Sequence, residues 1–132
     1  MAALFDVYLV TPERELWSGK ASIVIARGTE GEVGIMAGHE PMLIELAIGP
    51  LFIQTEGERL AAAVDGGFLH CITTDGQTRV DVLAGHAELE REINLDKARR
   101  QKEDAERRIA DLENGAARAD LAKALTRLNL GP

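Results

Sequence analysis

Cysteine, aromatic residues and long apolar runs are all scarce in this sequence of 132 residues. The single cysteine, Cys71, cannot form an internal disulfide or supply a cluster of thiolate ligands, which is typical of proteins kept in a reducing compartment. The most apolar stretch, residues 42–53, is interrupted by Glu45 and by Gly49-Pro50. No segment is therefore long enough to cross a bilayer as an apolar helix.

Positive charge is also in deficit, because 15 basic side chains face 22 acidic ones and the net charge is -7. An acidic chain does not neutralise phosphates unless it segregates its basic residues, so binding to nucleic acid is disfavoured. The first ten residues include Asp6 and lack the order of a secretory signal, so we expect a cytosolic protein. With 45% hydrophobic and 28% charged residues, the chain fits one globular domain or a small domain with an appendage.

Composition changes sharply near residue 87. Residues 1–87 hold 5 basic and 12 acidic side chains and 11 of the 13 glycines, whereas residues 88–132 hold 10 side chains of each charge. The second segment consists almost wholly of Ala, Leu, Glu, Lys, Arg and Asp, which favours helices, while the first is rich in turn-forming residues. We therefore predict two domains, residues 1–87 and residues 88–132.

The first segment alternates short apolar runs with turn signals, a pattern typical of an antiparallel β-sandwich or flattened barrel. The run from Phe5 to Leu9 has the period of two expected of a strand with two distinct faces. Glu56-Gly57, Asp65-Gly66-Gly67 and Asp75-Gly76 are turn signals between later runs. The predicted strands are residues 4–10, 21–26, 32–36, 51–55, 60–64, 68–73 and 79–83.

The second segment predicts an antiparallel helical hairpin, with helices over residues 93–113 and 116–128 and a left-handed stop at Asn114-Gly115. The apolar stripe on both helices is dominated by alanine, which lets helix axes approach but buries little area. Complete burial of the large apolar side chains of the hairpin would contribute about 12 to 24 kcal/mol of stabilising free energy. Against this, each backbone position that becomes ordered costs about 1 to 2 kcal/mol in conformational entropy. The hairpin is therefore expected to need a surface to lie on, which makes it a candidate switch.

Signals for catalysis and metal binding are weak. The histidines are scattered, and none has the spacing of a metal pair or a nucleophile beside it. Neither a GxxxxGK phosphate loop nor a GxGxxG turn is present. Glu30 and Glu32 could be imagined as a catalytic pair, but solvated hairpin charge explains them more simply. We predict no catalytic residue and no metal.

Basic residues are concentrated only within residues 99–108, where acidic residues interleave with them. This pattern favours a solvated helix face with ion pairs one turn apart. The alternative is a strip that docks on an acidic protein surface. Lys123 and Arg127 lie four residues apart on the second predicted helix and could clamp a phosphate.

Three motifs follow one another along the chain: VTP with WSG in residues 10–19, EGEVGI with GH and P in residues 30–41, and GGFL at residues 66–69. Together they resemble the epsilon subunit of bacterial and chloroplast F-type ATP synthase. The likeness extends over essentially the whole chain. It implies a sandwich of about ten strands that grips the gamma subunit and sits on the ring of c subunits, followed by a hairpin that faces the catalytic alpha/beta hexamer.

The resemblance also implies roles for single residues and for the hairpin. The family's ring-contact position falls on Glu32, with His39 in the neighbouring loop. In the family the hairpin either folds against the sandwich or stretches along gamma to restrain ATP hydrolysis. The implied location is the cytoplasmic face of the bacterial cell membrane, peripherally and through the complex.

Some members of the family bind ATP at the hairpin through an I-D-x-x-R-A motif. In the matching stretch, residues 93–98, Asn94 replaces the Asp and Lys97 replaces the Arg, while Lys123 replaces a second family Arg. Because lysine lacks the planar fork that holds a phosphate, we expect ATP, as a regulatory ligand, to bind weakly or not at all. A gapped alignment on residues 95–100 restores the Asp and Arg but ends in Arg where the motif has Ala. The possible nucleotide-binding residues are Glu88, Ile93, Asn94, Lys97, Ala98, Lys123 and Arg127.

The favoured function is a non-catalytic subunit that joins gamma to the c ring and inhibits ATP hydrolysis through its C-terminal helices. Two other classes remain open. A free-standing ATP sensor would use the same hairpin positions but would not bind gamma. A small hydrolase would use the glutamate pair with His39 and would reveal itself in a substrate screen.

Overall fold

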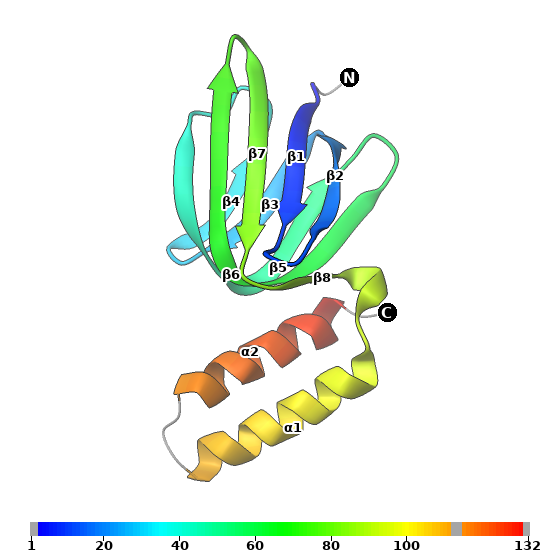
Figure 1. Ribbon diagram of the computed structural model, residues 1–132, viewed down its shortest axis with the longest axis vertical. Helices are drawn as coiled ribbons and strands as arrows, with labels where there is room; N and C mark the ends of the chain where they lie inside the picture. Colours follow the sequence, from blue (N-terminus) through cyan, green and yellow to red (C-terminus); the bar gives the residue numbers. More distant parts are fainter. Residues whose placement is uncertain (1–2, 112–114, 131–132) are drawn as a thin grey trace.

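The computed structural model describes residues 3–111 and 115–130, which form a β-sandwich followed by a helical hairpin (Figure 1). Helix η1 (Glu90–Glu92), of the 3-10 type, links the sandwich to α1 (Leu95–Asp111) and α2 (Gly115–Leu130). The predicted order of sandwich and hairpin is confirmed. The strands are β1 (Phe5–Val10), β2 (Glu15–Ala21), β3 (Ile23–Gly28), β4 (Gly31–Ile35), β5 (Met42–Gln54), β6 (Arg59–Thr74), β7 (Gln77–Ala84) and β8 (Ala87–Leu89).

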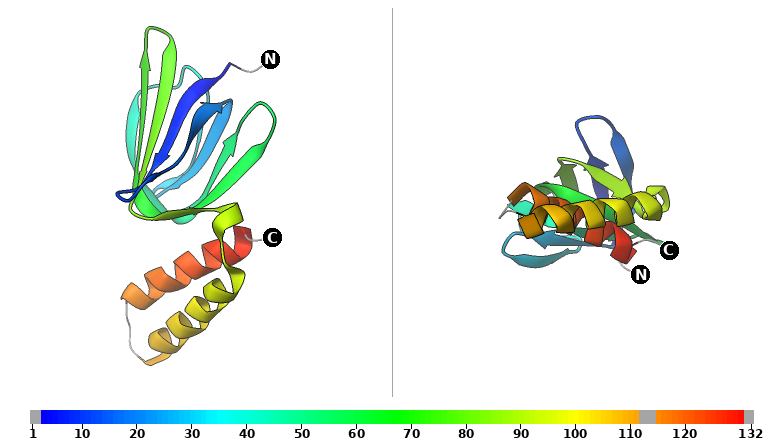
Figure 2. Two further views of the ribbon diagram at one scale, coloured as in Figure 1. Left: turned by 45° about the vertical axis from the view of Figure 1, so that its right-hand side comes forward. Right: turned by 90° about the horizontal axis from the view of Figure 1, so that it is seen from below.

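The strands form one sheet that folds over itself into two layers (Figure 2). Their order is β2-β1-β7-β6-β5-β3-β4, and β8 pairs with β6. Neighbours are antiparallel except for β1 and β7, which run parallel. The expected antiparallel sandwich therefore contains one parallel pair.

Residues 3–111 and 115–130 contain eight strands rather than the expected ten or so, because β5 and β6 each run through both layers. The first half of β5 pairs with the second half of β6 and the reverse, and the ladder is interrupted where Ala47 faces Gly66. Gly66 and Gly67 have φ angles of 82° and 127°, which suit glycine. The Asp65-Gly66-Gly67 signal is thus a bend within β6, and the prediction of a turn between two strands there was wrong.

Other turn signals behave as predicted. Glu56-Gly57 joins β5 to β6, and Asp75-Gly76 joins β6 to β7. Both Asp75 and Gly76 have positive φ, 52° and 76°, as a tight two-residue hairpin requires. The strand predicted over residues 21–26 corresponds to the first part of β3. It begins at Ile23 rather than at residue 21, because Ala21 ends β2 and the chain bends at Ser22, whose N–H donates to the Gln54 carbonyl over 2.8 Å.

The core lies between the two layers. Alternate residues of β1 point into it, and Phe5, Val7 and Leu9 are buried as the period of two predicted. Cys71 belongs to the same core, and burial raises the pKa of its thiol. The cysteine is therefore an inert packing residue.

The hairpin helices pack through alanine, as predicted. The shared seam consists of Ala98, Ala105, Ala117 and Ala124, each at most 1% exposed. Helix α2 lies against β5 and β6, whereas α1 lies on the far side of α2 (Figure 1). The hairpin is thus attached to the sandwich mainly through α2.

The ends of the helices differ slightly from the predicted ones. Helix α1 begins at Leu95 rather than at residue 93, because the Asn94 side chain caps it by accepting the Lys97 N–H over 3.0 Å. Gly115 is the first residue of α2. The predicted stop at Asn114 lies outside the described residues.

Candidate functional site

A cleft of about 850 Å³ is lined by residues of both the hairpin and the sandwich. Both helices, the strand β8 and the loop after β1 contribute charged side chains to it. Side chains of both charges line the cleft, and most of them form ion pairs with one another. Its charged lining includes Arg14, Asp65, Glu88, Glu92, Lys97, Asp104, Arg108, Asp120, Lys123 and Arg127.

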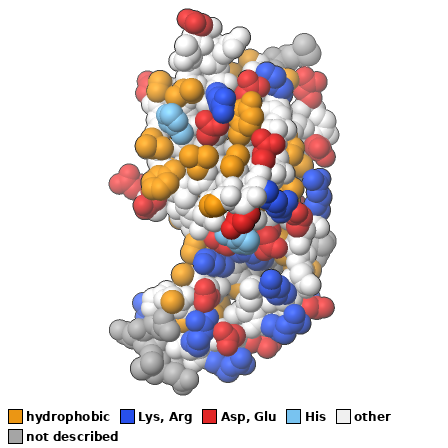
Figure 3. All heavy atoms as spheres, viewed as in Figure 1, with side chains coloured by type: hydrophobic (Ala, Val, Ile, Leu, Met, Phe, Trp, Pro, Cys, Tyr) orange, Lys and Arg blue, Asp and Glu red, His pale blue; other side chains and the backbone are white. Residues whose placement is uncertain are grey.

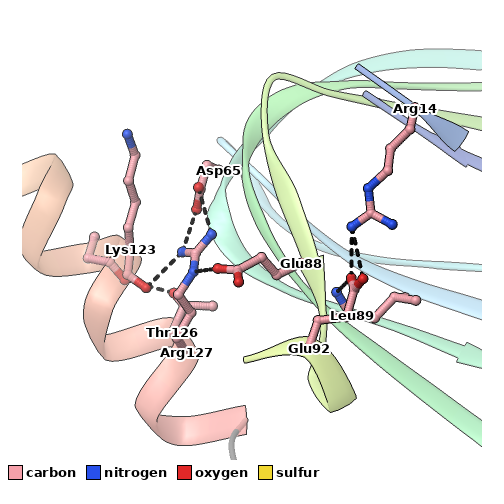
Figure 4. Close-up of polar contacts among 9 residues, drawn as sticks. Arg14, Asp65, Glu88, Leu89, Glu92, Lys123, Thr126 and Arg127 are labelled. Carbon is pink, nitrogen blue, oxygen red and sulfur yellow. Dashed lines mark hydrogen bonds and ion pairs between the residues drawn. The ribbon is translucent and has the colours of Figure 1, made fainter. Parts of the chain in front are cut away.

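Arg127 of α2 is the centre of an ion cluster at the floor of the cleft (Figure 4). Its Nη1 and Nη2 donate to Oδ1 and Oδ2 of Asp65, each over 2.8 Å, in a bidentate pair. Its Nε donates to Oε1 of Glu88 over 2.5 Å, and Nη1 also donates to the Lys123 carbonyl over 3.0 Å. The side chains of Arg127 and Asp65 are each 6% exposed, so the pair is buried.

Both carboxylates reach Arg127 because of the local fold. Asp65 stands just before the bend in β6, and its N–H donates to the His86 carbonyl over 2.9 Å. Glu88 lies on β8, which pairs with that part of β6. Burial by itself would lower the pKa of Arg127, but the hydrogen bonds to Asp65 and Glu88 outweigh it and raise the pKa. The guanidinium is therefore charged and matched by the carboxylates.

A second ion pair fixes the linker between the domains. Arg14, in the β1–β2 loop, donates through Nη2 to both carboxylate oxygens of Glu92, over 3.0 and 2.9 Å (Figure 4). The Leu89 N–H also donates to Glu92 over 3.0 Å. This backbone hydrogen bond, and then Arg14, hold the pKa of Glu92 below its usual value. The linker is thus tied to the sandwich through the Glu92 carboxylate.

The cleft brings together four of the seven possible nucleotide-binding residues. Glu88, Lys97, Lys123 and Arg127 line it. Arg127, however, is already held by acidic side chains, so it is not free to clamp a phosphate with Lys123. Lys97 and Lys123 remain the candidate contacts for an anion in the cleft.

The other three residues lie elsewhere or have structural roles. Asn94 caps α1, and Ala98 is buried in the alanine seam. Ile93 lines a separate groove near Arg59. These three residues of the motif-like stretch therefore do not line the cleft together: one caps a helix, one packs between the helices and one lines another groove.

Six of the ten charged residues named in the lining were not among the possible nucleotide-binding residues: Arg14, Asp65, Glu92, Asp104, Arg108 and Asp120. Asp65 belonged to a turn signal, and Arg14 and Glu92 lie 78 residues apart in the sequence. The acidic residues between the basic ones of α1 did predict local pairing, since Arg99 pairs with Asp96 and Arg108 with Asp104. The long-range partners had no comparable local pattern.

Glu32 lies near the start of β4, whereas His39 lies in the loop between the end of β4 and β5. Glu32 is exposed beside the β3–β4 turn. His39 is half-buried, its Nδ1 lies 2.8 Å from the Glu40 carbonyl, and its own carbonyl accepts the Thr73 hydroxyl over 2.9 Å. Glu32 is the more accessible of the two.

An apolar face lies on the outer side of β5, β6 and β7 (Figure 3). Phe68 pairs across the sheet with Leu83, and Leu43 and Ile72 share their side because of the alternation along β5 and β6. Leu43 is 66% exposed, and Phe68 and Leu83 are each 49% exposed. We call these four residues the apolar face.

Within residues 3–111 and 115–130, no group of three or more His, Cys, Asp or Glu side chains is placed to hold a metal ion. Neither of the two α-helices, over their described residues, is both long and apolar enough to cross a membrane.

This sequence is similar to those of proteins that are already described. The family described as "ATP synthase, Delta/Epsilon chain, beta-sandwich domain" matches residues 4–77. The ATP synthase epsilon chain of Thermobifida fusca is 44% identical over 126 residues, which cover 92% of this chain and 88% of the relative. That of Streptomyces avermitilis is 43% identical over 106 residues, which cover 80% and 82%.

A solved structure agrees over nearly the full length. A chain in the cryo-EM structure of the Euglena gracilis mitochondrial ATP synthase, OSCP/F1/c-ring, superposes with a TM-score of 0.75 and 26% identity, covering 98% of this chain and 80% of that one. The sandwich and the hairpin therefore both have counterparts in an assembled ATP synthase. The chain belongs to the family of ATP synthase epsilon chains, which are non-catalytic subunits of the central stalk.

Proposed function

We propose that this chain couples and regulates an ATP synthase. Its sandwich joins the gamma subunit to the c ring, so that proton-driven rotation reaches the catalytic sites, and its hairpin restrains ATP hydrolysis. The protein then sits peripherally at the cytoplasmic face of a bacterial membrane, held there through the complex. The observation that carries the proposal is the exposed apolar face, because a patch of this kind on a charged domain marks a protein contact.

The apolar face is the proposed contact with gamma. Leu83→Gln and Phe68→Ser should each weaken binding about tenfold or more, because central apolar residues carry most of the energy of an interface. Leu125→Gln is the matched control, since Leu125 is 38% exposed but lies on α2. Gel filtration with gamma measures the effect. Co-elution of both face variants at wild-type strength would count against this contact.

Glu32 is the proposed contact with the c ring, with His39 as a weaker candidate. The family position and the exposure of Glu32 support this assignment. His39 is half-buried, and its carbonyl accepts a hydrogen bond from Thr73, which leaves it less available. Crosslinking from a cysteine at position 32 or 39 to c subunits would distinguish the two.

The hairpin is the proposed regulatory element, meeting acidic surface on the alpha/beta hexamer through the basic residues of α1. Arg99 and Arg107 already pair with Asp96 and Asp104 on the same helix, so the remaining attraction is modest and should weaken as salt rises. The decisive experiment measures ATP hydrolysis by the reconstituted catalytic complex with and without this chain. Equal rates would refute inhibition.

ATP is proposed to bind the cleft weakly or not at all. Lys97 and Lys123 carry charge without a planar fork, and Asn94 is used as a helix cap. The same lysines are what favours the alternative function, a free-standing ATP sensor. Such a sensor would bind ATP tightly and would not co-elute with gamma.

The boundary between the two functional parts is proposed to lie in the linker. The predicted division at residue 87 falls inside β8, which continues to Leu89 and pairs with β6. Leu89 is 5% exposed and belongs to the core of the sandwich. We therefore propose a sandwich that ends at residue 89, a linker of residues 90–94 and a hairpin beyond it.

A further inference from the structure

The contact between α2 and the sandwich includes a buried charge cluster in which Arg127 is held by two carboxylates and one backbone carbonyl of the same chain. Four of the five N–H groups of a guanidinium are used at Arg127: two by Asp65, one by Glu88 and one by the Lys123 carbonyl. The fork that would suit a phosphate is therefore filled by a carboxylate of β6.

We propose that Asp65 is the built-in anionic ligand of Arg127, and that this pair holds the hairpin docked without any external phosphate. The inference deepens the regulatory half of the proposed function, because it names what keeps the hairpin off the catalytic subunits. It makes the docked arrangement a property of the chain alone.

Because the Arg127–Asp65 pair is buried, separating the two charges is energetically costly. Each of the two side chains is 6% exposed, so parting them while α2 stays in place leaves an uncompensated charge out of water. Because α1 lies beyond α2, Arg127 is on the helix whose release frees the whole hairpin. Glu88 adds a second carboxylate at 30% exposure, which fixes the Nε edge of the same group.

The position of Asp65 is also fixed independently of the hairpin. Its backbone is held in β6 by pairing with β5 and by the hydrogen bond from its N–H to the His86 carbonyl. The carboxylate is therefore presented by the sandwich at a set point, and Arg127 arrives at it when α2 docks. This is the geometry of a preformed ligand for an arginine.

Hydrogen exchange of the full chain tests the proposal. In Asp65→Asn the amides of α2 should exchange on the order of 10 to 100 times faster than in the wild type, because hydrogen bonds between charged groups are replaced by weaker ones. The amides of β1 and β7 should be unchanged. Asp75→Asn is the matched control, because Asp75 is exposed in the β6–β7 turn and Asn tolerates the same positive φ.

A second hydrogen-exchange experiment adds an anion to the wild-type protein. Excess ATP or inorganic pyrophosphate should leave exchange from α2 of the wild type unchanged. Slower exchange with either anion would overturn the proposal, since docking would then depend on an external phosphate. Wild-type exchange from α2 in Asp65→Asn would overturn it as well.

A further variant covers the case in which Asp65→Asn loosens the whole sandwich. Arg127→Lys keeps the charge but loses the fork, so it should speed exchange from α2 while Asp65 stays in place. Unchanged exchange in this variant would refute the role of the bidentate pair. Gel filtration with gamma tests the proposed function separately. Losing the Arg127–Asp65 pair leaves the apolar face intact, so the variants should still co-elute with gamma.

Discussion

Gly67 lies so close to Leu83 that a β-carbon at position 67 would stand 2.2 Å from the Leu83 carbonyl oxygen. Its φ of 127° is also one that other residues rarely adopt. We expect Gly67→Ala to lower the free energy of unfolding by about 3 kcal/mol or more, since strain and overlap act together. Urea unfolding measures it. Gly57→Ala, at a turn with open space around it, should change stability by less than about 1 kcal/mol.

Acid should weaken the tie between the linker and the sandwich. The pKa of Glu92 is lowered in the folded protein from an ordinary value of 4.5, so its contribution is complete above that pH and is lost as the pH falls through the folded value. Glu92→Gln should therefore be less stable than the wild type at neutral pH, and the difference should shrink in acid. Urea midpoints across pH test this, with Glu56→Gln in an exposed turn as the control. A difference that persists at low pH would contradict it.

Truncation should separate folding from regulation. A chain ending at residue 94 keeps β8 and the Arg14–Glu92 pair, so it should fold, bind gamma and raise ATP hydrolysis by the reconstituted complex relative to the full chain. A chain ending at residue 87 also loses Leu89 from the core and should be less stable by at least about 2 kcal/mol. If ATP hydrolysis is the same with the chain ending at 94 as with the full chain, the hairpin is not inhibitory.

Nucleotide affinity should follow the geometry of the cationic side chains. Calorimetry on the full chain should detect no tight binding of ATP. Replacing Lys97 and Lys123 together by Arg should raise the affinity about tenfold or more, because each guanidinium can bind phosphate oxygens in pairs. Lys102→Arg is the control, since Lys102 is on α1 but not among the lining residues of the cleft. Micromolar affinity in the wild type would contradict this prediction.

Local periodicity accounts for the parts of the fold that the sequence predicts well. The buried residues of β1 and the alanine seam of the hairpin each repeat at the period of one element, so a short window contains the whole signal. Strand β2 is different, because it lies at the edge of the sheet and three of its seven residues, Glu15, Ser18 and Lys20, are polar. Strand β8 has only three residues and therefore no period to detect.

The bend at Asp65-Gly66-Gly67 shows where local chemistry is ambiguous. An Asp followed by Gly is compatible with a tight turn and with a bend inside a long strand, and only the pairing with β5 decides between them. The ion cluster around Arg127 could not be predicted from local sequence either, because it uses Asp65 of this bend. Asp65 and Arg127 are 62 residues apart, and their meeting follows from the docking of α2 rather than from any motif.

The unbroken course of β5 and β6 through both layers has a mechanical consequence. A sandwich whose layers touch only through side chains can shear when opposite faces are pulled in different directions. Here a load applied near β7 reaches β3 along covalent backbone and its hydrogen-bonded ladder. Shear between the two layers is therefore resisted by covalent backbone as well as by side-chain packing, so the domain should deform little when it is twisted.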